Sequence, residues 1–327
     1  MHQFIHRACL AVLGLLAAPI ATAQDYPATQ VTLVVPFAAG GPTDKVARDL
    51  AEALRKPLGQ TVVVDNVGGA GGTRGAAKVA KAAPDGYTLL LHHIGMSTAQ
   101  ALYRTMPYKV PDDFEFLGMV NDVPMTLIAK PQMAASNYGE LVAWLQANKD
   151  KANLANAGLG SASHLCGLLF MQAIKTDLVT IPYQGTGPAM QALLGNQVDV
   201  MCDQTTNTSS QIAGGAVKAY AVTSSKRLGT PALAKLPTLD ELGLKGFNVS
   251  IWHGVYAPKG TSKAVLDKVQ AALKVALADA EFVKRQEALG AVVVTDARTQ
   301  PAEHRKFVEA EIAKWTPVIR AAGQYAD

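Results

Sequence analysis

The chain has 327 residues, of which 49% are hydrophobic, and a formal net charge of +4 at pH 7. This charge is too small to indicate nucleic-acid binding, and no block of Lys and Arg stands out in the sequence. The length and the apolar content are sufficient for about two domains of ordinary size.

The N-terminal residues predict export. A short polar start that ends at Arg7 is followed by the mostly apolar segment 8–21 and by an A-x-A sequence at 21–23, before Gln24. This is the pattern of a signal peptide, residues 1–23, and its apolar run is too short to span a bilayer. The alternative is a membrane anchor. We expect cleavage after Ala23 and an exported mature protein.

Strand-like and helix-like segments alternate along the rest of the chain. The expected strands are 30–37, 60–67, 86–93, 114–120, 124–131, 151–158, 178–185, 198–205, 217–224, 248–258 and 290–296. The expected helices are 46–54, 73–83, 138–149, 162–173, 188–195, 262–279 and 301–322. This alternation predicts an α/β fold with mostly parallel sheets flanked by helices. No flexible linker separates two domains, so strands near 121–124 and 252–258 are expected to cross between two lobes around a ligand cleft.

Three glycine-rich loops stand between a strand and a helix. They are "PFAAGGPTD" (36–44), "GLGS" (158–161) and "GTGP" (185–188). Backbone N–H groups at the start of a helix, together with the helix dipole, favour an anion. Ordinary tight turns are the alternative for any one loop, but three such loops favour an anionic ligand.

The motifs of cofactor enzymes are incomplete. "VGGAGGTRG" (67–75) resembles a dinucleotide fingerprint, but Arg74 takes the place of its third glycine. No phosphate-binding loop of the NTPase type occurs in the sequence. We therefore expect no cofactor.

Catalytic and metal-binding sets are also not indicated. Ser163 and His164 do not belong to a G-x-S-x-G motif, and neighbouring residues on a helix point apart. His92 and His93 end a strand, so their rings are expected on opposite faces. We expect no catalytic residues and no metal site.

Two cysteines remain after the signal peptide, Cys166 and Cys202. An even pair in an exported protein is a candidate disulfide. Two buried free thiols are the alternative.

A polar segment, "DQTTNT" (203–208), follows the strand 198–205. Ligands bind at the carboxyl ends of strands in such sheets, so this segment is a candidate ligand loop. A solvated turn is the alternative.

The chain resembles a known family through several motifs in the same order and spacing. They are "VVPFAAGGPTDKVAR", "NVGGAGG", "PDGYTLLL", "GSASHL", "PYQGTGPAMQALLGNQVD", "CDQTTNT" and "APKGT". With them the chain is similar to the substrate-binding proteins of tripartite tricarboxylate transporters, also called Bug receptors. It departs from the common "PFAPGGGTD" pattern at Ala39 and Pro42, which leaves open which amides face the ligand.

The resemblance implies a periplasmic, two-lobed binding protein of the type II kind, with lobe 1 at 24–123 and 254–327 and lobe 2 at 124–253. It implies that the loop 37–44 and the loop 160–164 hold a carboxylate, and that "PYQGTGP" and "DQTTN" shape the other end of the site. The expected ligand-binding residues are Phe37, Ala38, Ala39, Gly40, Gly41, Thr43, Asp44, His93, Gly160, Ser161, Ala162, Ser163, Tyr183, Gly185, Thr186, Asp203 and Thr206.

The expected function is capture of a small organic carboxylate, either a dicarboxylate or an acid with a bulky or aromatic body. The expected partners are the membrane subunits of the transporter, which recognise the closed form of a monomeric receptor, and not nucleic acid. Two alternatives are a sensor subunit that presents the same closed form to a signalling receptor, and a periplasmic hydrolase that uses Ser163 and His164.

Overall fold

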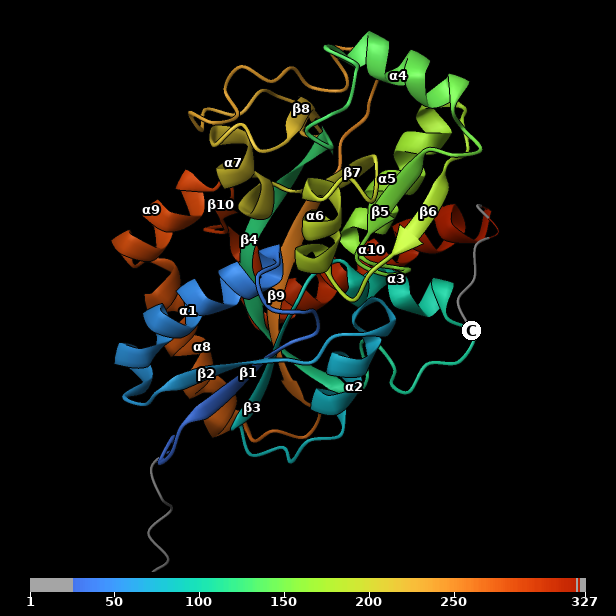
Figure 1. Cartoon of the computed structure of the whole chain (residues 1–327). Helices are drawn as coiled ribbons and strands as arrows, with labels where there is room; N and C mark the ends of the chain where they lie inside the picture. Colours follow the sequence, from blue (N-terminus) through green and yellow to red (C-terminus); the bar gives the residue numbers. More distant parts are fainter. Residues whose placement is uncertain (1–25, 322, 324–327) are drawn as a thin grey trace, which may run out of the picture.

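The computed structural model describes residues 26–321 and residue 323. The strands in this part of the chain form one mixed sheet of order β2-β1-β3-β9-β4-β7-β5-β6, in which β8 and β10 also pair with β4 (Figure 1). The strands are β1 (Val31–Val35), β2 (Val62–Asn66), β3 (Thr88–His92), β4 (Phe114–Ala129), β5 (Asn153–Asn156), β6 (Val179–Pro182), β7 (Val200–Gln204), β8 (Lys218–Val222), β9 (Ser250–Pro258) and β10 (Val292–Val293). The predicted signal peptide and its cleavage after Ala23 lie outside the described residues.

The sheet has two parallel ends joined by long antiparallel strands. β1 pairs in parallel with β2 and β3, and β5 pairs in parallel with β6 and β7. β9 and β4 lie between these ends and are antiparallel to each other. We call the part around β1, β2 and β3 lobe 1, and the part around β5, β6 and β7 lobe 2. The predicted two-lobed α/β fold is therefore confirmed.

β4 joins the lobes as one continuous strand. It pairs with β9 as far as Pro124 opposite Ser250, and from Met125 onwards it pairs with β7. The sequence predicted two strands here, 114–120 and 124–131, with the crossing between the lobes near 121–124. Proline has no backbone N–H, but Pro124 lies where β4 changes partner, so it interrupts no continuous ladder. The lobe boundaries themselves stay a prediction.

Helices pack around the sheet (Figure 1). They are α1 (Pro42–Leu58), α2 (Thr73–Ala80), α3 (Gly95–Leu102), α4 (Tyr138–Ala147), α5 (Ala162–Ile174), α6 (Thr186–Leu194), α7 (Thr205–Ala213), α8 (Lys263–Leu277), α9 (Ala280–Ala288) and α10 (Pro301–Ala321), with short 3-10 helices η1 (Ala70–Gly72) and η2 (Ala297–Thr299). In lobe 1, α1 packs against α8, and α10 packs against α3 and β4.

Three of these helices, α3, α7 and α9, were not predicted. The segment predicted as the polar loop 203–208 instead forms the end of β7 and the start of α7. Ser, Thr and Asn are weak helix formers because their side chains compete for backbone hydrogen bonds. Here the hydroxyl of Ser209 donates to the carbonyl of Thr205 (2.8 Å), one turn back, which is compatible with a helix.

Separate apolar clusters support each lobe. In lobe 1, Leu33 and Leu50 are fully buried between the sheet and the helices α1 and α8. In lobe 2, Leu154 of β5 and Phe170 of α5 are buried together in a second cluster, between the sheet and the helix. Burial of a single side chain of this kind contributes about 1.5–3 kcal/mol. A further cluster contains residues of both β3 and α5, so the lobes also share buried apolar surface across their junction.

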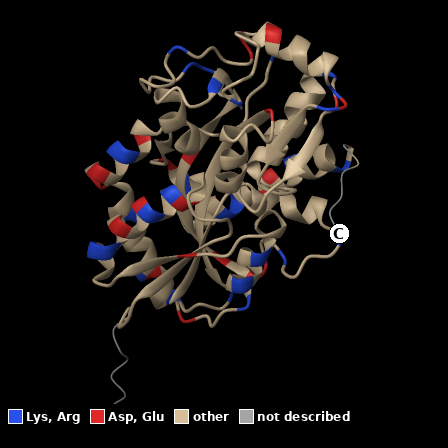
Figure 2. Ribbon diagram, in the orientation of Figure 1, with Lys and Arg blue, Asp and Glu red and all other residues tan. Residues whose placement is uncertain are grey.

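Charged residues lie mainly on the outer helices and turns (Figure 2). Among the Asp, Glu, Lys and Arg residues that the structure describes, only Asp44, Asp199 and Asp203 are buried. Asp199 lies away from the lobe junction and pairs with Lys130 (2.6 Å). The region between the lobes thus holds little formal charge.

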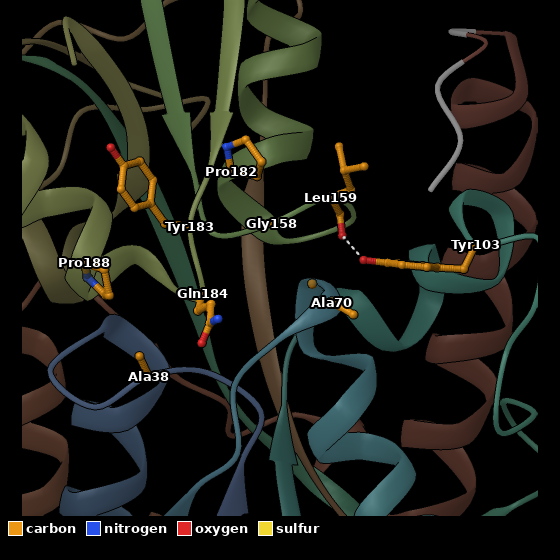
Figure 3. Close-up of a pocket in the computed structure, with 10 residues that line it drawn as sticks. Ala38, Ala70, Tyr103, Gly158, Leu159, Pro182, Tyr183, Gln184 and Pro188 are labelled. Atoms are coloured by element: carbon orange, nitrogen blue, oxygen red, sulfur yellow. Dashed lines mark hydrogen bonds between the residues drawn. The ribbon is translucent and has the colours of Figure 1, made fainter. Parts of the chain in front are cut away.

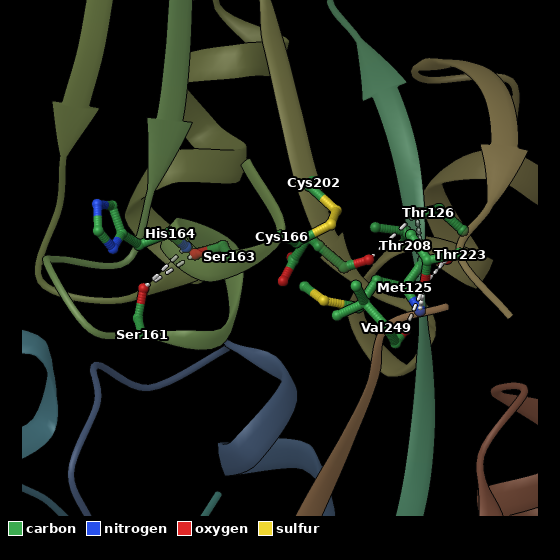
Figure 4. Close-up of a disulfide and its surroundings, with 11 residues drawn as sticks. Met125, Thr126, Ser161, Ser163, His164, Cys166, Cys202, Thr208, Thr223 and Val249 are labelled. Atoms are coloured by element: carbon green, nitrogen blue, oxygen red, sulfur yellow. Dashed lines mark hydrogen bonds between the residues drawn. A yellow bond between two sulfur atoms is a disulfide. The ribbon is translucent and has the colours of Figure 1, made fainter. Parts of the chain in front are cut away.

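Cys166 of α5 and Cys202 of β7 form a disulfide inside lobe 2 (Figure 4). Both residues are almost fully buried. The bond ties a helix that begins at the lobe junction to the strand that pairs with β4. Of the two alternatives left open by the sequence, the structure has the disulfide.

Replacing both cysteines by alanine is expected to lower the free energy of unfolding by about 2–4 kcal/mol, because the disulfide restricts the unfolded chain. Urea denaturation of the double variant and of the oxidised protein measures the difference. Maleimide labelling of both thiols in denatured, unreduced protein would contradict the prediction.

Candidate functional site

An enclosed cavity lies between the lobes. Its volume of about 10 Å³ leaves room for about one water molecule. Lobe 1 contributes the loop after β1, the start of α1 and the end of β3, and lobe 2 contributes the starts of α5, α6 and α7. The lining residues are Phe37, Pro42, Thr43, His93, Ala157, Ala162, Ser163, Thr186 and Gln204.

Four helices point their N-terminal ends at this cavity. The first two residues of α1 and of α5, the first residue of α6 and the N-cap residue of α7 all line it. Each end carries a partial positive charge from its unpaired N–H groups. None of the lining residues is Lys or Arg. The groups that this cavity offers to an anion are therefore helix N-termini and not a cationic side chain.

The start of α5 is fixed by its own hydroxyl groups (Figure 4). Ser161 is the N-cap residue and accepts a hydrogen bond from the amide of His164 (3.3 Å). Ser163 Oγ accepts from the amide of Ala157 (2.8 Å), and the amide of Gly160 donates to Nδ1 of His164 (3.2 Å). Ser163 and His164 thus have structural hydrogen bonds that hold the loop before α5.

In the loop 37–44, two backbone amides that were predicted to bind the ligand donate instead to other groups of the protein. The amide of Gly40 donates to Oδ2 of Asp44 (2.9 Å), and the amide of Ala38 donates across the lobe junction to the carbonyl of Gln184 (3.1 Å). Burial alone would raise the pKa of the Asp44 carboxyl, but the hydrogen bonds from Arg48 and Gly40 lower it below its ordinary value. Asp44 is therefore an ionised anchor of this loop.

Three histidines form a neutral wall beside the cavity. The ring of His93 stacks on Phe37 with centroids 4.7 Å apart, and His253 lies 5.9 Å from His93. Burial lowers the pKa of His93 well below its ordinary value and that of His253 to about 3. The prediction that His92 and His93 face opposite sides is wrong, because the strand ends at His92 and the two rings lie 5.0 Å apart.

The junction of β7 and α7 holds several buried polar atoms without a hydrogen-bond partner. They are Oδ1 of Asp203, Oε1 of Gln204, Oγ1 of Thr205 and Oγ1 of Thr206. Burial raises the pKa of Asp203 to about 7, although the hydrogen bond from Asn207 and the charge of Lys45 oppose the shift. Of these side chains, Gln204 lines the cavity, so its carbonyl oxygen is an acceptor for a bound molecule.

A larger groove of about 650 Å³ opens outward along the lobe junction (Figure 3). It is lined by Ala38, Ala70, Gly71, Tyr103, Gly158, Leu159, Pro182, Tyr183, Gln184 and Pro188. Both lobes contribute to it, and the hydrogen bond from Tyr103 to the carbonyl of Leu159 (3.1 Å) crosses it at one end. The groove is the outer mouth of the cleft.

The predicted site residues fall into four groups. The cavity is lined by Phe37, Thr43, His93, Ala162, Ser163 and Thr186, and the groove by Ala38 and Tyr183. Gly41, Asp44, Gly160, Ser161, Gly185, Asp203 and Thr206 are buried around them without lining either, and Ala39 and Gly40 are exposed. The sequence did not select Pro42, Ala157 or Gln204. Gln204 stood in the "DQTTN" motif. Its side chain faces the cavity because β7 continues to this residue, and the sequence did not predict where the strand ends.

No group of three or more His, Cys, Asp and Glu residues in the described part of the chain could hold a metal ion. Within the same residues, no helix has the length and apolar content that crossing a bilayer requires.

Comparison with known proteins identifies the family. Residues 46–324 match the model described as tripartite tricarboxylate transporter family receptor. The chain belongs to this receptor family. A curated relative from Agrobacterium vitis, a protein of the TAR-I ttuE-ttuC' intergenic region, is 45% identical over 93% of this chain and 88% of its own.

Solved structures of similar proteins agree with this assignment. The periplasmic binding protein BugD superposes with a TM-score of 0.89 at 53% identity, over 92% of this chain and all of BugD. MatC from Rhodopseudomonas palustris with bound malate has a TM-score of 0.85 at 39% identity, over 90% and 100% of the two chains. A further R. palustris protein, with adipate, has a TM-score of 0.86 at 31% identity, over 91% and 99%. Members of the transporter receptor family bind solutes and are not enzymes, so the predicted resemblance is confirmed.

The raised pKa of Asp203 in this receptor predicts a pH-dependent stability. A carboxyl whose pKa rises from 3.8 to about 7 on folding stabilises the protein fully below pH 3.8, and this stabilisation is lost as the pH rises through about 7. Asp203→Asn keeps an acceptor for Asn207 but cannot ionise. Its melting temperature is expected to exceed that of the wild type by at least about 2 °C above pH 7 and to match it near pH 4. Parallel pH profiles of the two proteins would contradict this.

Proposed function

We propose that this receptor captures a small organic carboxylate between its two lobes and delivers it to the membrane subunits of a tripartite tricarboxylate-type transporter. The observation that carries this proposal is the convergence of four helix N-termini on one cavity without a cationic side chain. Each helix end stabilises a negative charge by about 0.3–1 kcal/mol, and by more where it is partly buried.

Neutral donors are well suited to a receptor that must release its ligand. The hydroxyls of Ser163 and Thr186 line the cavity together with the N-terminal ends of the four helices, whereas the hydroxyl of Thr43 donates to Nε2 of His253. Hydrogen bonds to a charged group are about twice as strong as neutral ones, so a carboxylate gains more here than a neutral analogue. The malate and adipate bound to two family members support this ligand class.

Binding requires movement of the lobes, because the cavity of about 10 Å³ is too small for an organic acid. The strands β4 and β9 connect the lobes and allow the cleft to open around them. The acid enters, donors from both lobes meet its oxygens, and the closed form is presented to the transporter in the periplasm. Phe37 and His93 form an apolar face for the body of the ligand.

The direct test is calorimetric titration of the purified mature protein with malate, adipate and benzoate, each compared with its methyl ester. The acid is expected to bind at least about tenfold more tightly than the ester, because the ester lacks the charge that the helix ends attract. Equal binding of acid and ester, or no binding of any carboxylate in a wider panel, would overturn the proposed function.

Gln204→Leu is expected to weaken binding of a hydroxy acid such as malate by about tenfold, because Oε1 of Gln204 is an acceptor for the ligand's hydroxyl; an acid without a donor, such as adipate, should lose less. The melting temperature of the ligand-free protein should stay the same or rise, since Oε1 of Gln204 has no partner within the protein. Gln172→Leu, on the exposed side of α5, is the matched control and should change neither value. Unchanged affinity of the Gln204 variant would remove this residue from the site.

A further inference from the structure

A chain of buried hydrogen bonds runs from the cavity to the surface between α1 and α9. Thr43, which lines the cavity, bonds through Oγ1 to Nε2 of His253 in β9 (3.2 Å). Nδ1 of His253 bonds to Oδ1 of Asn121 in β4 (2.8 Å), whose amide nitrogen donates to Oε1 of Gln286 in α9 (2.8 Å). The amide nitrogen of Gln286 then donates to Oδ2 of Asp49 in α1 (2.8 Å). The four residues before Asp49 are at most 1% exposed, so water competes for none of their bonds.

Asp49 fixes the direction of every bond in this chain. An ionised carboxylate can only accept, so the amide nitrogen of Gln286 faces it and the carbonyl oxygen of Gln286 faces Asn121. For the same reason, the carbonyl oxygen of Asn121 faces His253. The ring of His253 is neutral, because burial lowers its pKa to about 3, so it carries a single ring proton, on Nδ1. Nε2 is then an acceptor, and the hydroxyl of Thr43 is its donor.

Arg285 favours the accepting form of Asp49. Nη1 of Arg285 lies 3.5 Å from Oδ1 of Asp49, whereas Gln286 bonds to Oδ2. Burial raises the pKa of this carboxyl above its ordinary value, and the positive charge of Arg285 opposes the shift. The two carboxylate oxygens thus have different partners, a cation and an amide.

The direction of the chain determines what the cavity offers to a ligand. The hydrogen of the Thr43 hydroxyl is committed to His253, so the oxygen can only accept from a bound molecule. In lobe 2, Oε1 of Gln204 is a second acceptor, and it has no partner. The helix N-termini supply donors for a carboxylate, but these two acceptors need a donor that the ligand itself carries.

We propose that Asp49 is a remote positioning residue that makes Thr43 an acceptor, and that the site therefore prefers acids with a hydroxyl group, such as malate, to acids without one, such as succinate. This inference rests on the proposed function and narrows its ligand class. It does not depend on how closely the lobes approach, because the chain lies on α1, β9, β4 and α9 and includes no residue of α5, α6 or α7. Malate and succinate have the same carbon skeleton, so comparing them isolates the hydroxyl.

Asp49→Asn is expected to reverse the chain. Arg285 can only donate, so it holds the carbonyl oxygen of the new side chain and leaves the amide nitrogen facing Gln286. The two amides of the chain then turn over, and the proton of His253 moves to Nε2. The hydroxyl of Thr43 becomes free to donate to a ligand. Turning an amide exchanges two groups of nearly the same size, so the reversal needs no repacking.

NMR of nitrogen-15-histidine-labelled, ligand-free protein at pH 8 reports the position of this proton. The wild type is expected to have His253 protonated on Nδ1, and Asp49→Asn to have it protonated on Nε2. Glu52→Gln is the matched control, because it makes the same change of charge on an exposed residue of the same helix and should keep the wild-type tautomer. A merely structural role of Asp49 would change stability but not the site of protonation. A proton that stays on Nδ1 in Asp49→Asn would overturn the proposal.

Calorimetric titration with malate and with succinate at pH 8 tests the ligand preference. The wild type is expected to bind malate at least about tenfold more tightly, because succinate leaves buried acceptors without a donor. Asp49→Asn should reduce this ratio severalfold, since Thr43 can then donate to a carboxylate, and Glu52→Gln should keep it. Equal affinities of the wild type for the two acids, or an unchanged ratio in Asp49→Asn, would overturn the proposal.

Thr43→Val provides a second variant, which leaves Asp49 in place. Valine has nearly the shape of threonine but lacks the hydroxyl. This variant should bind malate severalfold more weakly and lose less affinity for succinate, which has no hydroxyl to donate. Both acids are compared in the same variant, so a general loss of stability does not change the ratio. An equal loss for both acids would count against the acceptor role of Thr43.

The NMR measurement needs no ligand, which separates this inference from the proposed function. An unchanged tautomer in Asp49→Asn would overturn the inference even if carboxylates bind. A reversed tautomer without binding of any acid would overturn the proposed function, and the ligand preference with it, while the role of Asp49 in the chain would stand.

Discussion

The antiparallel pairing of β4 with β9 is the constraint on which the rest of the structure depends. These two strands connect the parallel ends of the sheet, and β4 exchanges β9 for β7 at Pro124 and Met125. Each lobe has a buried apolar cluster, and a further cluster with residues of β3 and α5 crosses the junction, so the lobes also pack against each other through apolar side chains. The cavity lies between the two parts of the sheet that this connection joins.

The electrostatics of the cleft follow from burial of its polar groups. Burial keeps the histidines neutral and raises the pKa of Asp203, and the nearest cation, Lys45, reaches from α1 to Oδ1 of Asn207 across the junction (3.4 Å). Attraction for an anion then depends on helix ends, which act over a short range. An acid gains this attraction only when the lobes are close enough for the helix ends of both to surround it.

Sequence periodicity was sufficient for most of the fold but not for the details of the site. Buried strands such as β1 and β3 are continuous apolar runs, and the sequence placed them within a few residues. The helix α7 could not be recognised, because its Thr, Asn and Ser residues have weak helix propensity and are stabilised by contacts within the folded protein. Three glycine loops were predicted as anion sites, while Gly71 stood in "VGGAGGTRG", which was read as an incomplete cofactor motif. Whether a loop approaches a ligand or the opposite lobe is a property of tertiary structure, and for Gly71 it is the opposite lobe.

A chain of buried hydrogen bonds links the lobe 1 wall of the cavity to β9 and β4, the strands that connect the lobes. Nδ1 of His253 in β9 bonds to Oδ1 of Asn121 in β4 (2.8 Å), whose amide donates to Gln286, so this neutral ring carries its proton on Nδ1. Nε2 of His253 is then the acceptor for the hydroxyl of Thr43 (3.2 Å) at the start of α1. Thr43 therefore lines the cavity while it is bonded to His253 of β9 and, through that ring, linked to Asn121 of β4. Because every member of this chain is paired, the lobe 1 wall of the cavity is preformed.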